Sequence, residues 1–269
     1  MNQISRRCAL ITGASAGIGK AFAELFAAEG YDLVLTARRR QRLEDLARAC
    51  RERHGVEARV VVADLADAKA PQAIFDELAE AGVAIDALVN NAGYGVPNAY
   101  MSTTWQQQAD FIQVLVTAVA ELSHLFLPGM IERGWGRIIN VSSVAGLIPG
   151  SAGHTLYGGA KAFLIKMTEA LSHETVGTGV QVSALCPGFT YSEFHDVTGT
   201  RELVNQMPER MWLTAEEVAR HGYDAVMADE PIAITGGIYK FYCLLARYLP
   251  TGLARGMVRR RSGEFHAQG

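Results

Sequence analysis

The stretch Thr12-Gly13-Ala14-Ser15-Ala16-Gly17-Ile18-Gly19 decides the fold of this 269-residue chain. It ends a short apolar run, residues 8–12, and leads directly into a segment of helical period. Glycines at this junction allow a tight bend between strand and helix and let the backbone come close to a phosphate group. The free N–H groups at the start of a helix favour bound phosphate. The stretch therefore predicts a nucleotide site, and a glycine-rich turn that holds no ligand is the alternative.

Short apolar runs rich in β-branched residues alternate with helical segments along the chain. Several runs are unbroken by polar residues, which is typical of strands buried on both faces of a parallel sheet. The expected strands are residues 8–12, 31–36, 59–63, 85–90, 137–142, 180–186 and 232–235. The expected helices are residues 19–29, 41–53, 70–81, 105–133, 157–176 and 215–228. The pattern predicts an α/β protein with a doubly wound, Rossmann-type parallel sheet of about seven strands and helices on both faces.

Composition and charge narrow the function classes. Apolar residues make up 49% and charged residues 20%, as in a folded globule rather than a disordered chain. Lysine and arginine number 25 against 28 acids, so the net charge of −3 does not favour a nucleic-acid partner. The four cysteines lie far apart without zinc-ligand spacing, which predicts a reduced, cytoplasmic protein. We expect neither a signal peptide nor a membrane-spanning helix, since no stretch has roughly 18 uncharged apolar residues.

Arg38, Arg39 and Arg40 follow the second expected strand, and no acidic residue lies there. Proteins that bind NAD usually have Asp or Glu at this point for the free ribose 2′-hydroxyl, whereas a 2′-phosphate requires a cation. We therefore expect NADP(H), with Arg38 as the main contact because it is nearest the strand end. The alternative is that these arginines form the solvated start of the next helix.

Tyr157 and Lys161 lie four residues apart at the start of an expected helix, so their side chains share one face. An ammonium group beside a phenol stabilises the phenolate, which would move the pKa of Tyr157 down toward the range useful for proton transfer. Ser142 and Ser143 end the preceding strand, where a hydroxyl can polarise a substrate carbonyl. An isolated pair with this spacing occurs on many helices by chance, but in company with the glycine turn it indicates a catalytic site.

Together these residues resemble the short-chain dehydrogenase/reductase family. The matching positions, in family order and spacing, are residues 12–19, Asp64, Asn90-Asn91-Ala92-Gly93, Ser143, Tyr157, Lys161 and Pro187-Gly188. The resemblance implies the strand order 3-2-1-4-5-6-7 and hydride exchange between a nicotinamide and a carbonyl or alcohol carbon. It also implies that Tyr157 is the catalytic acid/base, that Lys161 holds the nicotinamide ribose and tunes the tyrosine, and that Ser143 orients the substrate oxygen.

The resemblance also selects individual residues. Ser143 is preferred to Ser142 because Ser143-Val-Ala-Gly146 has the family pattern of serine, two residues and glycine. Thr190 matches a position that often contacts the nicotinamide amide. The implied cofactor-binding residues are Gly13, Ser15, Gly17, Ile18, Gly19, Arg38, Arg39, Asp64, Leu65, Asn91, Ala92, Gly93, Tyr157, Lys161, Pro187, Gly188 and Thr190. No metal is expected.

One position departs from the family pattern inside the long helix at 105–133. The family usually has an asparagine there, which holds a water that connects the lysine to solvent, and the matching residue is Leu115. Leucine cannot hold that water, and Gln113 lies about 200° away around a regular helix. Either protons take another route or turnover is slow. A catalytically weakened NADP(H)-binding or sensing protein of the same family is therefore the alternative function.

The C-terminus departs as well. We expect residues 1–238 to form the short-chain dehydrogenase/reductase domain and residues 239–269 to be a basic and aromatic extension packed on it. Residues 239–249 have a helical apolar pattern, and six basic residues but no acid lie within residues 231–263. The extension resembles tails of family branches that act on apolar ketones and alcohols. Packing on the body or on a second subunit is the simpler interpretation, and peripheral contact with an anionic membrane is the alternative.

The expected substrate is a small apolar carbonyl or alcohol. Residues 94–100, 147–156 and 191–211 are expected to line its pocket, since they are predominantly apolar with few charges. His154 and His195 could touch substrate, although a surface or hydrogen-bonded histidine is the simpler interpretation. Family resemblance also suggests a homodimer or homotetramer, formed through the helices at residues 105–133 and 157–176.

Overall fold

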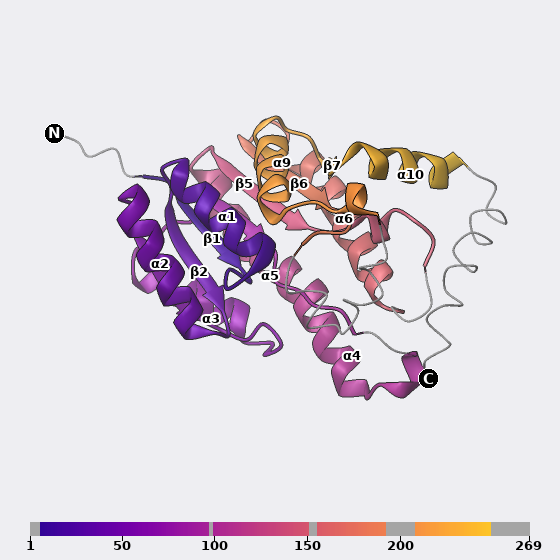
Figure 1. Ribbon diagram of the computed structural model, residues 1–269. Helices are drawn as coiled ribbons and strands as arrows, with labels where there is room; N and C mark the ends of the chain where they lie inside the picture. Colours follow the sequence, from indigo (N-terminus) through magenta and orange to yellow (C-terminus); the bar gives the residue numbers. More distant parts are fainter. Residues whose placement is uncertain (1–5, 97–98, 151–154, 192–207, 249–269) are drawn as a thin grey trace.

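One parallel sheet has the strand order β3-β2-β1-β4-β5-β6-β7 in the computed structural model, which describes residues 6–96, 99–150, 155–191 and 208–248 (Figure 1). The strands are β1 (Cys8–Thr12), β2 (Asp32–Ala37), β3 (Ala58–Val62), β4 (Ala87–Asn90), β5 (Gly136–Val141), β6 (Val180–Cys186) and β7 (Ile232–Ile234). All neighbouring strands are parallel. The order reverses between β1 and β4, and in such sheets ligands bind at the carboxyl ends of the strands there. The expected fold class and strand order are confirmed.

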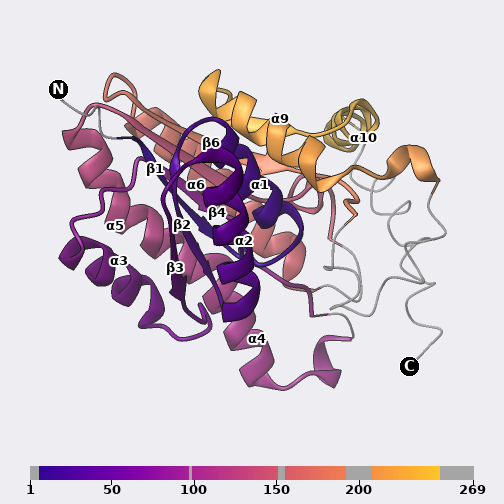
Figure 2. The same ribbon diagram turned by 60° about the vertical axis from the view of Figure 1, so that its left-hand side comes forward.

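Helices cover both faces of the sheet (Figures 1 and 2). One face carries α1 (Gly17–Ala28), α2 (Arg40–His54) and α9 (Ala215–Met227), and the other carries α3 (Ala70–Glu80), α4 (Trp105–Ile112), α5 (Ala118–Glu132) and α6 (Tyr157–Glu174). Phe22 and Phe26 fill the first layer, whereas Phe111 and Leu122 fill the second. Because both faces are covered, central strand residues such as Leu10 are fully buried, which explains their unbroken apolar runs.

Within the described loops at the carboxyl side of the sheet lie three short 3-10 segments. They are η1 (Tyr100–Ser102), η3 (Val144–Gly146) and η4 (Glu209–Met211). The hydroxyl of Ser143 accepts a hydrogen bond from the Ala145 N–H at 3.1 Å and so caps η3. This cap fixes the backbone immediately after β5.

The helix expected at residues 105–133 is not regular. A π-helical segment, η2 (Gln113–Thr117), separates α4 from α5. A π segment changes which side chains face the core, and such segments are frequent at functional sites. The run Trp105–Glu132 is long and apolar enough to cross a membrane by length and composition, with a mean hydropathy of 1.7. Because Phe111 and Phe126 are buried against the sheet, we interpret it as a core helix.

The helical pattern at the start of the C-terminal extension is confirmed by α10 (Gly237–Tyr248). Tyr239 and Cys243 are buried, whereas Phe241 and Tyr248 are 61% and 75% exposed. The four cysteines are free and buried. The domain division after residue 238 stays a prediction, and residues 249–269 lie outside the described part of the chain.

Candidate active site

The glycine turn between β1 and α1 has the backbone that its sequence predicts. Gly13 and Gly17 have φ angles of +66° and +54°, a region that favours glycine. A Cβ at Gly19 would lie 2.4 Å from the Gly13 carbonyl oxygen, so a side chain does not fit there. Ala16 caps α1 without a side-chain hydrogen bond, and the first turn contains no acid. The first N–H groups of α1, including that of Ile18, are thus left for an anion.

Thr12 and Asn91 join the glycine turn to the end of β4. The Thr12 hydroxyl accepts hydrogen bonds from the N–H groups of Asn91 and Ala92, both at 2.9 Å, and donates to the Val89 carbonyl oxygen at 3.2 Å. The Asn91 amide donates to the Thr12 carbonyl oxygen at 2.9 Å. Asn91 and Ala92 therefore shape the β1–β4 crevice through Thr12, a role for Thr12 that the sequence analysis missed. The feature of the sequence that could have revealed this role is the position of Thr12 at the end of β1, next to β4.

The arginines after β2 make different contacts. Arg39 donates from Nε and Nη2 to the Ser15 hydroxyl at 3.1 and 2.9 Å, so its guanidinium lies at the glycine turn. Arg38 lies 3.8 Å from the carboxylate of Asp64, and both groups are exposed. Arg40 pairs along α2 with an acidic residue one turn later. The guanidinium that contacts the turn is thus that of Arg39, whereas Arg38 was the expected main contact.

Asp64 and Leu65 lie just beyond β3, which ends at Val62 rather than at the expected residue 63. The Asp64 carboxylate accepts a hydrogen bond from the Ala66 N–H at 3.1 Å. Leu65 is buried in the core beneath the sheet. The pair therefore lies at the carboxyl edge of the sheet, with Asp64 exposed beside Arg38.

Ser143, Tyr157 and Lys161 come together at the carboxyl end of β5. The phenol of Tyr157, the first residue of α6, shares a side-chain hydrogen bond with Ser143. Lys161 is 6% exposed, donates from Nζ to the Val141 carbonyl oxygen at 2.8 Å, and lies 5.7 Å from the centre of the Tyr157 ring. Ser142 instead donates to the Lys161 carbonyl oxygen at 2.7 Å. Ser143, and not Ser142, is therefore the serine beside the phenol.

Burial changes the acidity of both titratable groups in this cluster. Burial raises the pKa of Tyr157, and the hydrogen bond with Ser143 opposes this only in part. Burial lowers the pKa of Lys161 to about 8. The expected lowering of the Tyr157 pKa is therefore wrong for the protein alone, because desolvation of the phenolate outweighs the hydrogen bond with Ser143, and the Lys161 ammonium group is bonded to Val141 instead. At neutral pH the phenol keeps its proton.

Pro187, Gly188 and Thr190 follow β6, and Pro187 lies beside Ser143. The Pro187 carbonyl oxygen is 3.5 Å from the Ser143 hydroxyl. Thr190 is buried, and its hydroxyl donates to the Gly188 carbonyl oxygen at 3.1 Å. A Cβ at Gly188 would lie 2.1 Å from the ring of Tyr239 in α10. Tyr239 therefore shapes this loop, which the sequence analysis did not predict.

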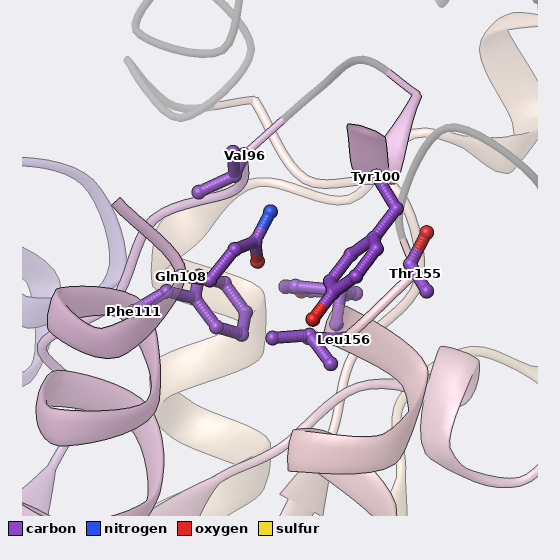
Figure 3. A pocket seen from close by; sticks show the side chains of 7 residues that line it. Val96, Tyr100, Gln108, Phe111, Thr155 and Leu156 are labelled. Carbon is purple, nitrogen blue, oxygen red and sulfur yellow. The ribbon is translucent and has the colours of Figure 1, made fainter. Parts of the chain in front are cut away.

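A small hollow, the Tyr157 hollow, opens between α4, α6 and the loop after β4 (Figure 3). Its lining residues are Val96, Tyr100, Gln108, Phe111, Thr155, Leu156 and Tyr157. The loops at 94–100 and 147–156 contribute to it as predicted, but Gln108 and Phe111 were missed. They lie three residues apart on one face of α4, and this helical spacing is the feature of the sequence that could have revealed them. His154 and His195 lie outside the described residues, among which no cluster of His, Cys, Asp and Glu could hold a metal ion.

Leu115 lies inside the irregular segment, at the position where the family usually has asparagine. Its side chain is fully buried and faces Gly93, because a Cβ at Gly93 would lie 3.6 Å from Leu115 Cγ. The Nε2 atom of Gln113 is buried without a hydrogen-bond partner among the described residues. Because η2 is π-helical, the 200° separation of a regular helix does not apply to these two side chains.

Comparisons with known proteins agree with this geometry. A family model described as short chain dehydrogenase matches residues 7–202. Sulfoacetaldehyde reductase 2 of Chromohalobacter salexigens is 39% identical over 187 residues, which are 69% of this chain and 73% of the relative. A short-chain dehydrogenase from Sphingobium yanoikuyae, solved in complex with NADPH, has a TM-score of 0.80 and 31% identity and covers 93% of this chain and 94% of its own. A 7β-hydroxysteroid dehydrogenase structure has a TM-score of 0.84 and 29% identity and covers 96% of both chains. From its sequence, its sheet and its buried site alike, the chain belongs to the short-chain dehydrogenase/reductase family of oxidoreductases.

Proposed function

We propose that the protein transfers a hydride between the nicotinamide of NADP(H) and the carbonyl or secondary-alcohol carbon of a small, largely apolar molecule. The observation that carries this proposal is the cluster of Ser143, Tyr157 and Lys161 beside the Tyr157 hollow. The cluster combines a proton donor, its hydrogen-bond partner and a buried cation. It lies at the sheet edge where the glycine turn also ends.

The residues at that edge fit NADP(H). The glycine turn has no room for a side chain at Gly13 or Gly19 and leaves the N–H groups of α1 for a pyrophosphate. Arg39, which already contacts Ser15, and the neighbouring Arg38 would hold the 2′-phosphate, because no acid follows β2 to bind a free 2′-hydroxyl. Asp64, Leu65 and the Asn91-Ala92-Gly93 run would line the adenine side. Pro187, Gly188 and Thr190 would line the nicotinamide side. Bound there, NADPH supplies the hydride for reduction.

The chain's own groups supply the proton and orient the substrate. In reduction, Tyr157 would donate its phenolic proton to the substrate oxygen, and Ser143 would orient that oxygen by a hydrogen bond. Lys161 keeps its positive charge at neutral pH and would stabilise the phenolate as it forms, while holding the nicotinamide ribose. Because burial keeps the phenol protonated, the free site is ready for reduction rather than for oxidation.

The walls of the Tyr157 hollow support a neutral, apolar substrate. Val96, Phe111 and Leu156 supply hydrocarbon surface, and the described lining residues include no Lys, Arg, Asp or Glu. Sulfoacetaldehyde reductase, by its name, acts on a sulfonate, which calls for a cation, and none is present among the described lining residues. A neutral ketone therefore suits this chain better than sulfoacetaldehyde does.

The test measures the oxidation of NADPH through the loss of its absorbance, in the presence of a panel of neutral ketones or of sulfoacetaldehyde. We expect reduction of at least one neutral ketone and little reduction of sulfoacetaldehyde. Tight NADPH binding without oxidation by any compound would instead support the alternative function, a catalytically weakened binding or sensing protein. The observation that favours this second candidate is Leu115, which places buried hydrocarbon at the position of the family's water-holding asparagine.

Assembly, location and membrane contact stay predictions. A homodimer or homotetramer formed through α4, α5 and α6 is tested by light scattering, and a cytoplasmic location by fractionation.

Exposed Phe241, Leu244 and Tyr248 on α10 support contact with a membrane surface, together with the basic residues that follow in the sequence. Flotation with anionic vesicles at low salt tests that contact, and its absence would leave α10 only a packing role.

A further inference from the structure

Gln108 is a polar residue on the buried face of α4. Its side chain lines the Tyr157 hollow together with Phe111 and Tyr157, and the residue is only 6% exposed. Figure 3 shows the Gln108 amide and the Tyr100 ring on opposite walls of the hollow. A buried amide in apolar surroundings is unfavourable unless its polar atoms are hydrogen-bonded, so its partners are informative.

The orientation of this amide is fixed by Thr103. The Gln108 Nε2 atom lies 2.6 Å from the Thr103 hydroxyl oxygen, and that hydroxyl donates its proton to the Tyr100 carbonyl oxygen at 2.8 Å. A hydroxyl has one proton, so the Gln108 atom that faces it must be a donor. The NH₂ group is therefore held against Thr103, and Oε1 is left for the hollow.

The Oε1 atom accepts no hydrogen bond from any described residue. Unlike the hydroxyls of Tyr100 and Thr155 in the same wall, which rotate to donate or to accept, an amide oxygen can only accept. The hollow thus presents one fixed acceptor, beside hydroxyl groups that can turn and the hydrocarbon of Val96, Phe111 and Leu156. A substrate without a donor at this point would leave Oε1 desolvated and unpaired, and sites of this kind discriminate strongly between substrates.

We propose that Gln108 is a specificity-determining residue, whose Oε1 accepts a hydrogen bond from a hydroxyl or N–H group that the substrate carries away from its carbonyl. The substrate class is then a neutral ketone or aldehyde with such a donor. A carboxylate or sulfonate would face the negative end of the amide dipole with no cation in the described walls. This inference rests on the proposed function, because it places the substrate in the hollow beside Tyr157.

The first measurement compares matched ketones with the wild-type protein. The probes are meta- and para-hydroxyacetophenone and their methyl ethers, because a methoxy group has nearly the electronic effect of a hydroxyl but cannot donate. We expect kcat/KM with NADPH to be at least about tenfold higher for one hydroxyketone than for its ether, which corresponds to about 1.4 kcal/mol. A ratio near one for both pairs would overturn the proposal.

Two variants then test whether Gln108 causes the preference for the hydroxyketone over its ether. Gln108→Leu removes the acceptor at similar volume and should bring the ratio to within about threefold of one. Thr103→Val frees the amide to turn its NH₂ group into the hollow, so the ratio should also fall although Gln108 is present. Persistence of the wild-type ratio in either folded variant would contradict the role of Gln108, and Thr103→Val provides this test even where Gln108→Leu does not fold.

Binding separates this inference from the proposed function. Calorimetry with the NADP⁺-loaded protein, which has no hydride to transfer to a ketone, measures the dissociation constants of the same four ketones. Tighter binding of a hydroxyketone without turnover would contradict the proposed function and support the role of Gln108. Turnover of all four ketones with equal affinity would support the proposed function and contradict the role of Gln108.

Discussion

The ring of Tyr239 covers Gly188 so closely that a Cβ on Gly188 would lie 2.1 Å from two ring carbons. The Tyr239 hydroxyl also accepts a hydrogen bond from the Phe189 N–H at 3.0 Å and donates one to the Met211 carbonyl oxygen at 2.6 Å. Phe189 and Met211 lie on either side of residues 192–207 in the sequence. One side chain of α10 therefore holds both segments that flank this stretch, next to the expected nicotinamide contact Thr190.

Tyr239→Phe should destabilise the protein and weaken NADPH binding. The change removes the hydroxyl that joins the Met211 carbonyl to the Phe189 N–H, and the loss of a hydrogen bond to the buried Met211 carbonyl costs about 1–3 kcal/mol. Urea unfolding measures the stability, and a titration with NADPH measures the affinity. Tyr242→Phe is the matched control, because Tyr242 is an exposed tyrosine of the same helix. Equal behaviour of the two variants would show that the hydroxyl of Tyr239 has no such role.

The arginines after β2 should determine cofactor choice. We expect the wild-type protein to bind NADPH at least about tenfold more tightly than NADH. Arg39→Ala and Arg38→Asp should each reduce this difference in affinity between NADPH and NADH, since a charged hydrogen bond to phosphate contributes about 1.5–3 kcal/mol. Arg40→Ala is the control, because Arg40 pairs along α2 instead. Equal wild-type affinities for NADPH and NADH, measured by calorimetry, would rule out this basis for selectivity.

Lys161 should make stability depend on pH. Its pKa is about 8 in the folded protein against a usual 10.5, so between these values the unfolded chain holds a proton that the folded protein has released. The free energy of unfolding therefore rises with pH across this window, and the cost of the buried charge is fully present below pH 8. Lys161→Met should be more stable than the wild type at pH 7 by about 2 kcal/mol, after allowance for the lost hydrogen bond to Val141. This advantage should disappear by about pH 10.5.

Denaturant unfolding of both proteins from pH 7 to pH 10 measures this difference. Lys166→Met is the control, because Lys166 is an exposed lysine of the same helix and should show no such pH-dependent gain. A Lys161→Met variant that is less stable than the wild type at every pH would show that the ammonium group is not destabilising.

Leu115→Asn tests the departure from the family pattern. If proton supply to Lys161 limits turnover, the asparagine should raise the rate and lower the solvent isotope effect. It should also lower the melting temperature, because an amide buried without partners costs about 1–3 kcal/mol. Unchanged turnover and isotope effect in a variant that folds and binds NADPH would mean that protons already reach Lys161 by another route.

The fold could be predicted because the strands are buried on both faces. Apolar runs such as those of β1 and β6 fit only the interior of a sheet that is covered on both faces. The glycine turn marks where the first strand ends. The π-helical segment at Gln113–Thr117 could not be predicted, because its sequence is apolar and continuous with the helices on both sides. Helical periodicity alone does not reveal an extra residue in one turn.

The juxtaposition of Tyr157 and Lys161 could be predicted from their spacing, whereas their environment could not. Tyr157 and Lys161 lie one turn apart on α6, so the sequence brings them to one face. The direction of the Tyr157 pKa depends on burial by surrounding loops, which sequence spacing does not contain. The contacts of Tyr239 with the loop after β6, and the orientation of the Gln108 amide against Thr103, appear only once the chain is folded.

Turnover by Tyr157→Phe tests most directly whether this chain donates its proton from Tyr157. The variant loses only the hydroxyl, so its kcat for a neutral ketone should fall by about a hundredfold or more, while its NADPH dissociation constant stays within about twofold of the wild type. Tyr223→Phe, which removes a hydroxyl from α9 on the opposite face of the sheet, is the control and should keep wild-type turnover. Retention of more than about a tenth of wild-type kcat in Tyr157→Phe would contradict the assignment of Tyr157 as the proton donor.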